Sequence, residues 1–303
     1  MLDKFITHFL FLTVTIFISQ ACFALEYLDE QRDIPYNQLS YEASKLLLTL
    51  GTEVTLNKKP VAEVHDELVT PEKGDAIIPQ SGSVYTVTTD SSFFGRRTTY
   101  TMWFDDNAAL LQRLKELRRG SKSNAKLYRL THNGKHDFRK DFDDENYTVK
   151  LSEIENWGNS FSAYPVDVEA GQVVSESSAL LYLVSQLKLQ NPGDEASLIL
   201  FSDDQLVNTT LVVDGKTKLK TDFTVSDGGN SRRIKEKERS VVKVIVKPVD
   251  SQGNPVKDLE VMGLKGNIIM YIDEATRLLL QISGDIDVAG EVDIKLISAS
   301  KAP

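Results

Sequence analysis

Carboxylate clusters are the side chains of this sequence with the clearest potential for acid–base chemistry. They stand at positions 105–106, 143–145 and 203–204. Paired carboxylates can act as the general acid and the general base of a hydrolase. Each cluster falls where a turn is expected, however, and turns favour aspartate because its side chain bonds the turn backbone. The sequence has no nucleophile elbow, no glycine-rich phosphate loop and no calcium-loop spacing. We therefore predict a protein that is not an enzyme, with no catalytic residue and no cofactor.

Histidines offer a second kind of chemistry, the binding of a metal ion. His132 and His136 flank Asn133-Gly134, the strongest short hairpin signal in the chain. With Asn133-Gly134 as a two-residue turn, position 132 faces 135 and position 131 faces 136, so the two imidazoles point to opposite faces of the hairpin. Exposed turn histidines explain the pair better than a chelate does. We predict no metal site.

Two segments carry residues suited to contact with a partner. The first is the turn between predicted strands at 84–90 and 97–104, with Phe93, Phe94, Arg96 and Arg97. Adjacent phenylalanines at a tip expose apolar area, and arginines suit a lipid head group or an acidic surface. We predict contact with a membrane or an envelope protein there; the alternative is a tip folded back over the sheet. The second is a mostly basic loop at 228–239, which suits anionic lipid, although its glutamates favour a solvated loop.

One helix, predicted over 177–190, is expected to position a ligand-binding surface. Its apolar positions recur at i, i+3, i+4 and i+7, and they are Leu180, Leu183, Val184 and Leu187. Ser177 or Ser178 can cap its start, and Pro192-Gly193 ends it. A lone apolar helix among strands buries its stripe against a sheet, so a core helix is the simplest interpretation. A helix that covers a concave sheet also closes a cavity, and we predict that these four residues bind an acyl chain there.

Strands are expected in most of the remaining chain. Short runs rich in β-branched and aromatic residues alternate with turn signals from 84–90 onward, including a meander at 196–201, 205–213 and 216–225. Positions 110–119 fit either a helix or a strand. Positions 39–56 favour two strands bent at Gly51 over a helix. The fold class is therefore mainly β (a β-rich α+β protein), an antiparallel barrel, half-barrel or sandwich with one central helix. We expect one domain over 25–303, with two β layers joined near 150–165 as the alternative.

The first 24 residues have the pattern of a signal peptide. A charged start precedes an apolar run at 5–18, and small residues follow at Cys22 and Ala24. The run is shorter than the roughly 20 residues that span a membrane. We predict cleavage after Ala24 and a periplasmic location, with a lipoprotein acylated at Cys22 as the alternative. Cys22 is the only cysteine, so the cleaved chain would have neither disulfide nor thiol chemistry.

A formal net charge of −9 argues against nucleic acid as a partner of the whole chain. The apolar content is ordinary, and glycine and proline are not excessive. These proportions are typical of a globular protein with a hydrophobic core.

Several short motifs follow one another along the chain. They are Tyr41-Glu42-Ala43, Ser178 to Leu183, Pro192-Gly193-Asp194, Val213-Asp214-Gly215, Ile269 to Asp273 with Arg277-Leu278-Leu279, and Gly290-Glu291-Val292. This order resembles a family of exported bacterial proteins named domain of unknown function 3108. The resemblance implies a curved antiparallel sheet with a helix in its concave side, similar to the lipoprotein-carrier proteins of the bacterial envelope. It implies no catalytic residue.

These features together predict a non-enzymatic envelope protein of a Gram-negative bacterium. Its expected partner is a lipid or lipoprotein acyl chain held between sheet and helix, with affinity from buried apolar area. The alternative is a structural or assembly factor that acts by protein–protein contact and binds no ligand.

Overall fold

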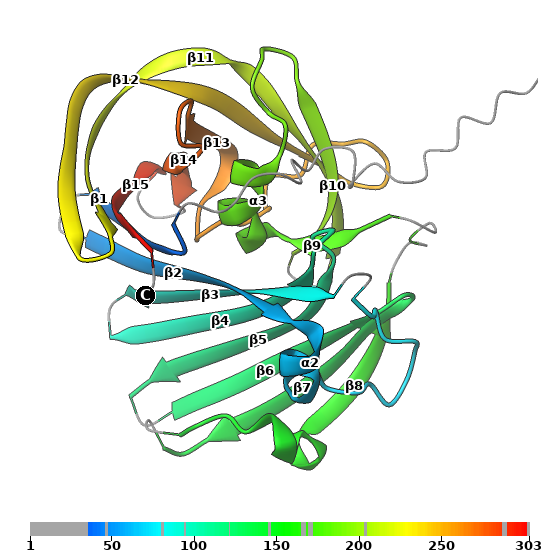
Figure 1. Ribbon diagram of the computed structural model, residues 1–303. Helices are drawn as coiled ribbons and strands as arrows, with labels where there is room; N and C mark the ends of the chain where they lie inside the picture. Colours follow the sequence, from blue (N-terminus) through cyan, green and yellow to red (C-terminus); the bar gives the residue numbers. More distant parts are fainter. Residues whose placement is uncertain are drawn as a thin grey trace, which may run out of the picture.

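Strands dominate the described residues of the computed structural model, and they join into one 15-stranded sheet (Figure 1). The structure describes residues 36–45, 48–79, 82–93, 95–120, 122–144, 147–164, 168, 172–202, 205–286 and 290–301. The predicted signal peptide and Cys22 therefore lie outside the described residues. Within these ranges, no helix is both long and apolar enough to cross a membrane.

The first and last strands of the chain are neighbours at the centre of the sheet order. One half contains β1 (Gln38–Lys45), β2 (Leu48–Pro60), β3 (Ser83–Phe93), β4 (Arg96–Asp105), β5 (Leu110–Arg119), β6 (Lys122–Thr131), β7 (Gly134–Phe142) and β8 (Gly158–Ala163). The other contains β9 (Val174–Glu176), β10 (Glu195–Ser202), β11 (Gln205–Asp227), β12 (Asn230–Val249), β13 (Lys265–Asp273), β14 (Leu279–Ile286) and β15 (Gly290–Ser300). The order runs from β8 to β1 and then from β15 to β9. The predicted mainly β class is confirmed.

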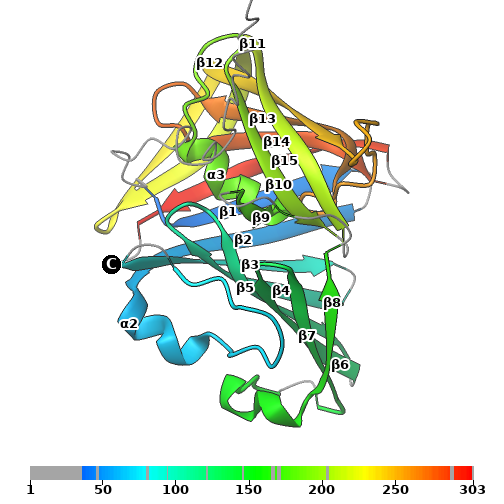
Figure 2. The same ribbon diagram turned by 90° about the vertical axis from the view of Figure 1, so that its right-hand side faces the viewer.

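Strand β11 closes part of the sheet on itself. It pairs antiparallel with β12 along most of its length, and its Thr224–Ser226 segment pairs parallel with Ser298–Ser300 of β15. This extra pairing encloses β11 to β15 in a ring, and α3 (Leu180–Gln186) with the preceding turn η3 (Ser177–Ala179) lies inside the curve (Figures 1 and 2). The curvature is compatible with the half-barrel interpretation.

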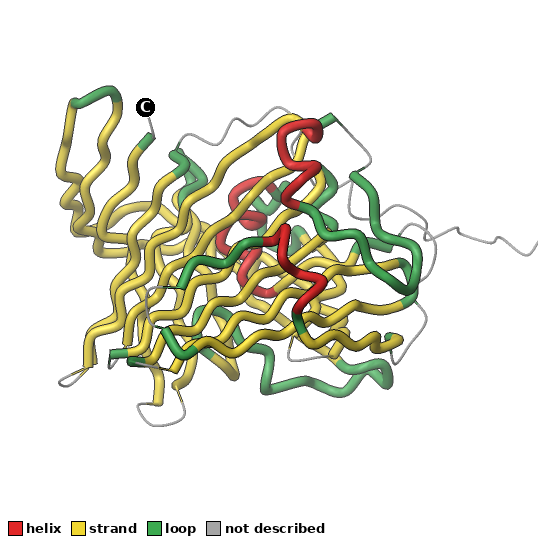
Figure 3. The backbone as a smooth tube through the Cα atoms, turned by 90° about the horizontal axis from the view of Figure 1, so that it is seen from below, coloured by secondary structure: helices red, strands yellow, loops and turns green. Residues whose placement is uncertain are grey.

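Three other short helical segments cover the opposite face of the β3–β7 region (Figure 3). They are α2 (Val61–Val64), η1 (His65–Glu67) and η2 (Leu151–Asn156). Side chains of β3 to β6 therefore enter two hydrophobic clusters, one on each face. Met102 belongs to the larger cluster around α3, for example, and its neighbour Trp103 to the smaller one beneath α2. The N-terminal half of the sheet is buried on both sides there.

Two-sided burial explains why positions 110–119 fitted two patterns. Strand β5 buries five consecutive residues from Leu110 to Leu114, which removes the alternation typical of a half-exposed strand. The predicted strand pair 84–90 and 97–104 is confirmed as β3 and β4, and 39–56 does form two strands. Gly51 lies inside β2, however, so the predicted bend there is wrong.

Other boundaries also differ from the prediction. Segment 228–239 is not a loop: Gly228-Gly229 turns the chain, and β12 begins at Asn230. Asp214-Gly215 is not a turn but an irregularity inside β11, where the register with β12 shifts. The edge strand β8 lies within the predicted junction at 150–165. Residues 261–264 form a turn closed by a bridge from Val261 to Leu264. Turn residues such as glycine and aspartate indicated irregular backbone at these places. Pairing with distant strands determined whether each place became a turn, a strand or an irregularity within a strand.

The central helix is shorter than predicted. It ends at Gln186, because Leu187 has extended backbone angles of φ −72° and ψ 148°. Neither Ser177 nor Ser178 caps it with a side chain. Instead, Glu176 accepts a hydrogen bond from the Ser178 backbone N–H at 2.7 Å, at the start of η3. A helix of two turns is marginal by itself, so burial must stabilise it.

Candidate ligand-binding site

A cavity of about 450 Å³ lies between α3, the β1–β2 pair and the turn that joins β13 to β14. Its apolar walls come from three separate parts of the chain, and they include Leu39, Val54, Leu56, Leu181 and Leu278. Polar and charged residues complete the lining, and they are Asn37, Ser185, Gln186, Gln190, Glu274, Thr276 and Arg277. Apolar walls combined with polar groups that can orient a ligand are typical of small-molecule sites.

Helix α3 contacts the core and the cavity with different faces. The four predicted ligand-binding residues, Leu180, Leu183, Val184 and Leu187, are each at most 2% exposed and belong to the main hydrophobic cluster. They are not among the residues that line the cavity. From this helix the cavity is lined by Leu181, Tyr182, Ser185 and Gln186, which the stripe pattern did not select. The stripe therefore fixes the helix in place, and the adjacent face is the one available to a ligand.

Charged side chains from distant strands hold the two ends of this helical segment. At its start, Arg113 Nη1 of β5 donates to Glu176 Oε1 at 3.2 Å. At its end, Arg277 Nη2 donates to the carbonyl oxygens of Val184 and Leu187, each at 3.2 Å. A cation at the C-terminal carbonyls also suits the helix dipole. Arg277 has φ 61°, in the left-handed region, so the turn strains its own backbone to place this guanidinium.

The β13–β14 turn, which forms one wall of the cavity, is organised by Asp273. This carboxylate accepts two hydrogen bonds from Arg239, at 2.7 and 2.9 Å, and one from the Thr276 backbone N–H at 2.8 Å. Burial by itself raises the pKa of Asp273, but the bonds from Arg239 and Thr276 outweigh it and hold the pKa below its ordinary value. The turn therefore carries a buried carboxylate that stays ionised.

Tyr182 gives the cavity a polar group that stays protonated. Its ring lies 5.8 Å from the ring of Tyr85, centroid to centroid. Burial, and then the neighbouring Tyr85, raise the pKa of Tyr182 well above its ordinary value. The phenol is therefore neutral at all physiological pH values.

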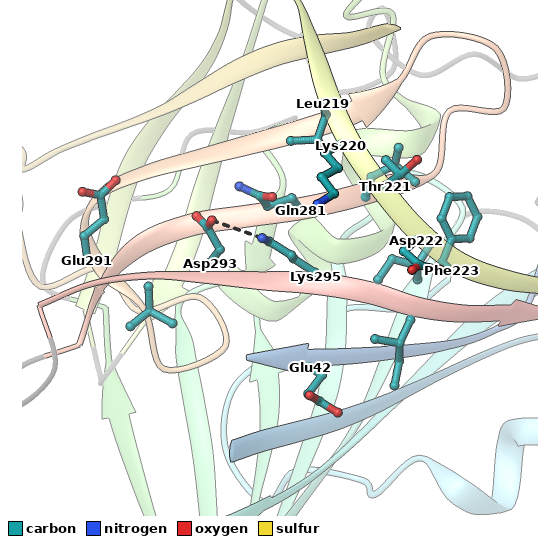
Figure 4. A pocket seen from close by; sticks show the side chains of 14 residues that line it. Glu42, Leu219, Lys220, Thr221, Asp222, Phe223, Gln281, Glu291, Asp293 and Lys295 are labelled. Carbon is teal, nitrogen blue, oxygen red and sulfur yellow. Dashed lines mark ion pairs between the residues drawn. The ribbon is translucent and has the colours of Figure 1, made fainter. Parts of the chain in front are cut away.

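A larger and more polar cavity, of about 730 Å³, lies between β11 and the β14–β15 pair (Figure 4). Charged side chains of both signs line it, and Lys295 lies 3.6 Å from Asp293. Both of these side chains are largely exposed. Such a lining does not remove an acyl chain from water, so this cavity fits the predicted ligand less well than the 450 Å³ cavity does.

The two candidate metal-binding histidines have different environments, because the hairpin register differs from the prediction. Thr131 pairs with Gly134, so the turn is His132-Asn133. His132 is exposed, but His136 is 1% exposed, and its Nδ1 accepts a hydrogen bond from the Glu72 backbone N–H at 3.1 Å. The expectation of two exposed turn histidines is therefore wrong for His136. Among the described residues, no group of three or more histidine, cysteine or acidic side chains is placed to hold a metal ion.

Of the predicted partner-contact residues, Arg97 is engaged within the chain. It donates to Asp90 through Nε and Nη2, and this hydrogen bonding raises the pKa of Arg97. Arg96 is exposed and pairs with Phe93 across the hairpin backbone. Phe94 lies outside the described residues. Contact with a partner through this tip stays a prediction.

The acidic cluster at 105–106 has a structural role in the β4–β5 turn. Asp105 is 2% exposed, and its Oδ1 accepts hydrogen bonds from the backbone N–H groups of Asn107 and Ala109 at 2.9 and 2.8 Å. These bonds stabilise the β4–β5 turn, as expected for an aspartate at that place. Asp203 and Asp204 lie outside the described residues.

The comparisons with known proteins identify no relative. No protein-family model matches the chain, and neither a curated protein nor a solved structure matches it. The resemblance to domain of unknown function 3108 stays a prediction.

Proposed function

We propose that this protein is an exported, non-enzymatic binding protein of the bacterial envelope. Its ligand is an amphiphile whose acyl chain occupies the cavity between α3, β1–β2 and the β13–β14 turn. The observation that supports this proposal is the lining: five leucine and valine side chains surround about 450 Å³, within the usual range of about 300–1,000 Å³ for ligand sites.

The position of the helix supports a cavity that exists before the ligand arrives. Glu176, through its bond from Arg113 of β5, and Arg277, through its bond to the Val184 carbonyl, connect the two ends of the helical segment to other parts of the chain. The buried stripe of α3 fixes its orientation against the sheet. A site that needs little rearrangement loses less conformational entropy on binding.

The affinity expected from burial of the ligand's acyl chain alone is modest. Each buried methylene contributes about 0.8 kcal/mol, so ten of them contribute about 8 kcal/mol. Lost translational and rotational freedom opposes this by at least about 4 kcal/mol. The remainder is at most about 4 kcal/mol, so a single chain of this length should bind with a Kd of about 1 mM or weaker. Tighter binding requires recognition of the head group.

Native mass spectrometry of the purified protein with palmitate tests the proposal. The variant Ser185→Trp places an indole in the cavity from a half-buried position, and Ser185→Ala is its matched control. We expect one bound chain per protein in the wild type and in Ser185→Ala, and at least about tenfold weaker binding in Ser185→Trp. Unfolding midpoints verify that both variants are folded.

Two outcomes would contradict the proposal. One is a wild-type protein that binds neither palmitate nor a lipid from its own cell envelope. The other is a folded Ser185→Trp variant that binds palmitate as well as the wild type does. Either result would favour the alternative, an assembly factor that acts by protein–protein contact.

A further inference from the structure

A second, smaller cavity lies directly beside the acyl-chain cavity. It has a volume of about 280 Å³, and it lies between β12, the end of β11 and the β13–β14 turn. Tyr36, Thr276 and Leu278 line both cavities. The two spaces therefore adjoin at these three residues.

Basic residues predominate along this second cavity. Four residues of β12 that border it are cationic, against the single carboxylate of Glu236: they are Arg232, Arg233, Lys235 and Arg239. Strand alternation directs Arg233 and Lys235 to the other face of β12, where both pair with Asp222, and it leaves Arg232 and Arg239 on the face with Phe223. An apolar cavity thus adjoins a positively charged one. This division matches an amphiphile with an apolar chain and an anionic head group.

Three of the four cations already have carboxylate partners. Arg233 donates to both oxygens of Asp222 at 2.6 and 2.8 Å, and Lys235 lies 3.5 Å from the same carboxylate. Arg239 is bonded to Asp273 and to Glu236. Arg232 is exposed and has no ion-pair partner among the described residues. Its guanidinium is the cation most available to a ligand.

The strand register places Arg232 on the face that lines the cavity. Arg232 pairs with Val225 and Ile234 pairs with Phe223 across the β11–β12 ladder. Positions two apart on a strand share a face, so Arg232 lies on the same face as Ile234, beside the buried side chains of Val225 and Phe223. Arg232 therefore lies beside an apolar surface formed by Val225 and Phe223.

We infer that the two cavities form one site for a phosphate-bearing lipid, with the acyl chain in the apolar cavity and the phosphate against Arg232 in the basic one. Arginine suits this role because its planar guanidinium can donate two parallel hydrogen bonds to a phosphate. The inference rests on the proposed function. It adds recognition of the head group to the weak affinity that the acyl chain provides by itself. It commits to a membrane-derived head group rather than to free phosphate.

Isothermal titration of the full chain with three probes tests this inference. The probes are palmitoyl lysophosphatidylglycerol, neutral monopalmitoylglycerol with the same chain, and inorganic phosphate. We expect the wild type to bind the phospholipid about tenfold more tightly than the neutral lipid. In Arg232→Glu this ratio should fall to about one, with affinity for the neutral lipid unchanged. Arg232→Lys should retain part of the preference, because lysine keeps the charge but loses the bidentate geometry.

Lys237→Glu is the matched control, because Lys237 is exposed on the same strand and is not among the residues that line the basic cavity. It changes net charge equally and should leave the ratio unchanged. Equal binding of both lipids, unaffected by Arg232→Glu, would overturn the inference and leave the proposed function intact. Binding of neither lipid would overturn both. Inorganic phosphate that binds as tightly as the phospholipid, even in Ser185→Trp, would indicate a free-phosphate site and would also overturn the inference.

Discussion

Buried charged residues hold the irregular segments of this protein to its sheet. Arg129 is 4% exposed, and its guanidinium donates to the carbonyl oxygens of Val69, Leu111 and Ile77. Burial lowers the pKa of Arg129 to about 10, so it is still charged at neutral pH. It fixes the loop between η1 and β3 as Arg277 fixes the end of α3. Each of these residues satisfies carbonyl groups that lie outside the regular strand pairing.

Asp273→Asn tests this role in the turn beside the cavity. The substitution removes the negative charge opposite Arg239, whose side chain is only 14% exposed. We expect a loss of about 3 kcal/mol in the free energy of unfolding at pH 7, because a poorly solvated cation loses its main partner. Urea unfolding followed by circular dichroism measures it. Asp222→Asn is the control: its ion pair with Arg233 is exposed, so the change in stability should be much smaller than for Asp273→Asn.

The same carboxylate predicts a dependence of stability on pH. The pKa of Asp273 is lower in the folded protein than its ordinary value of 3.8. Its stabilising contribution is therefore complete above that ordinary value and is lost as pH falls toward the lower folded pKa. Between about pH 5 and about pH 3, the wild type should lose more stability than Asp273→Asn does. Parallel pH profiles of the two proteins would show that Asp273 carries no such linkage.

At the scale of elements, the β6–β7 hairpin shows how closely strands approach at the edge of the sheet. A Cβ atom added at Gly134 would lie 2.4 Å from the carbonyl oxygen of Ser162 in β8. Glycine is thus required at this position by the neighbouring strand. At Gly51, inside β2, an added Cβ would meet nothing within 4 Å.

These two glycines give a matched pair of substitutions. Gly134→Ala should lower the free energy of unfolding by about 1–3 kcal/mol, because β8 must shift away from the hairpin. The backbone amide hydrogens of β8 should then exchange faster. Gly51→Ala should change the free energy of unfolding by no more than about 1 kcal/mol, since its site is open. Hydrogen exchange and denaturant unfolding measure both effects. Unchanged protection of residues 158–163 in Gly134→Ala would show that β8 does not rest against Gly134.

For the molecule as a whole, the local pattern predicted the class of fold better than the site. Period-two alternation and turn residues indicated a mainly β protein with one central helix, because both depend on local geometry. The cavity depends on Leu39 and Leu278, which are far apart in sequence and meet only through the pairing of β1 with β15 and of β14 with β15. The helical stripe identified the buried face, since hydrophobic periodicity reports burial rather than exposure to a ligand. The basic strand at 230–239 was predicted as a loop because its charges mask its pairing with β11.

The continuous sheet also couples the two hydrophobic clusters. Strands β3 to β6 supply alternate side chains to both clusters. Loss of packing in one cluster therefore disturbs strands that also form the other cluster. The protein has two tryptophans, Trp103 and Trp157, and both belong to the smaller cluster. Their fluorescence therefore reports on the part of the molecule that does not contain α3.

The variant Leu183→Ala tests whether the two hydrophobic clusters unfold together. Leu183 is 2% exposed in the larger cluster, and the truncation should lower the free energy of unfolding by about 2–5 kcal/mol. If the sheet unfolds as one cooperative unit, the tryptophan signal should shift to lower denaturant concentration by the same amount as the circular dichroism signal. A tryptophan midpoint that stays in place while the circular dichroism transition splits would mean that the two clusters unfold separately. Phe138→Leu, in the tryptophan-containing cluster, makes the reciprocal test: its loss of packing should shift both signals together as well.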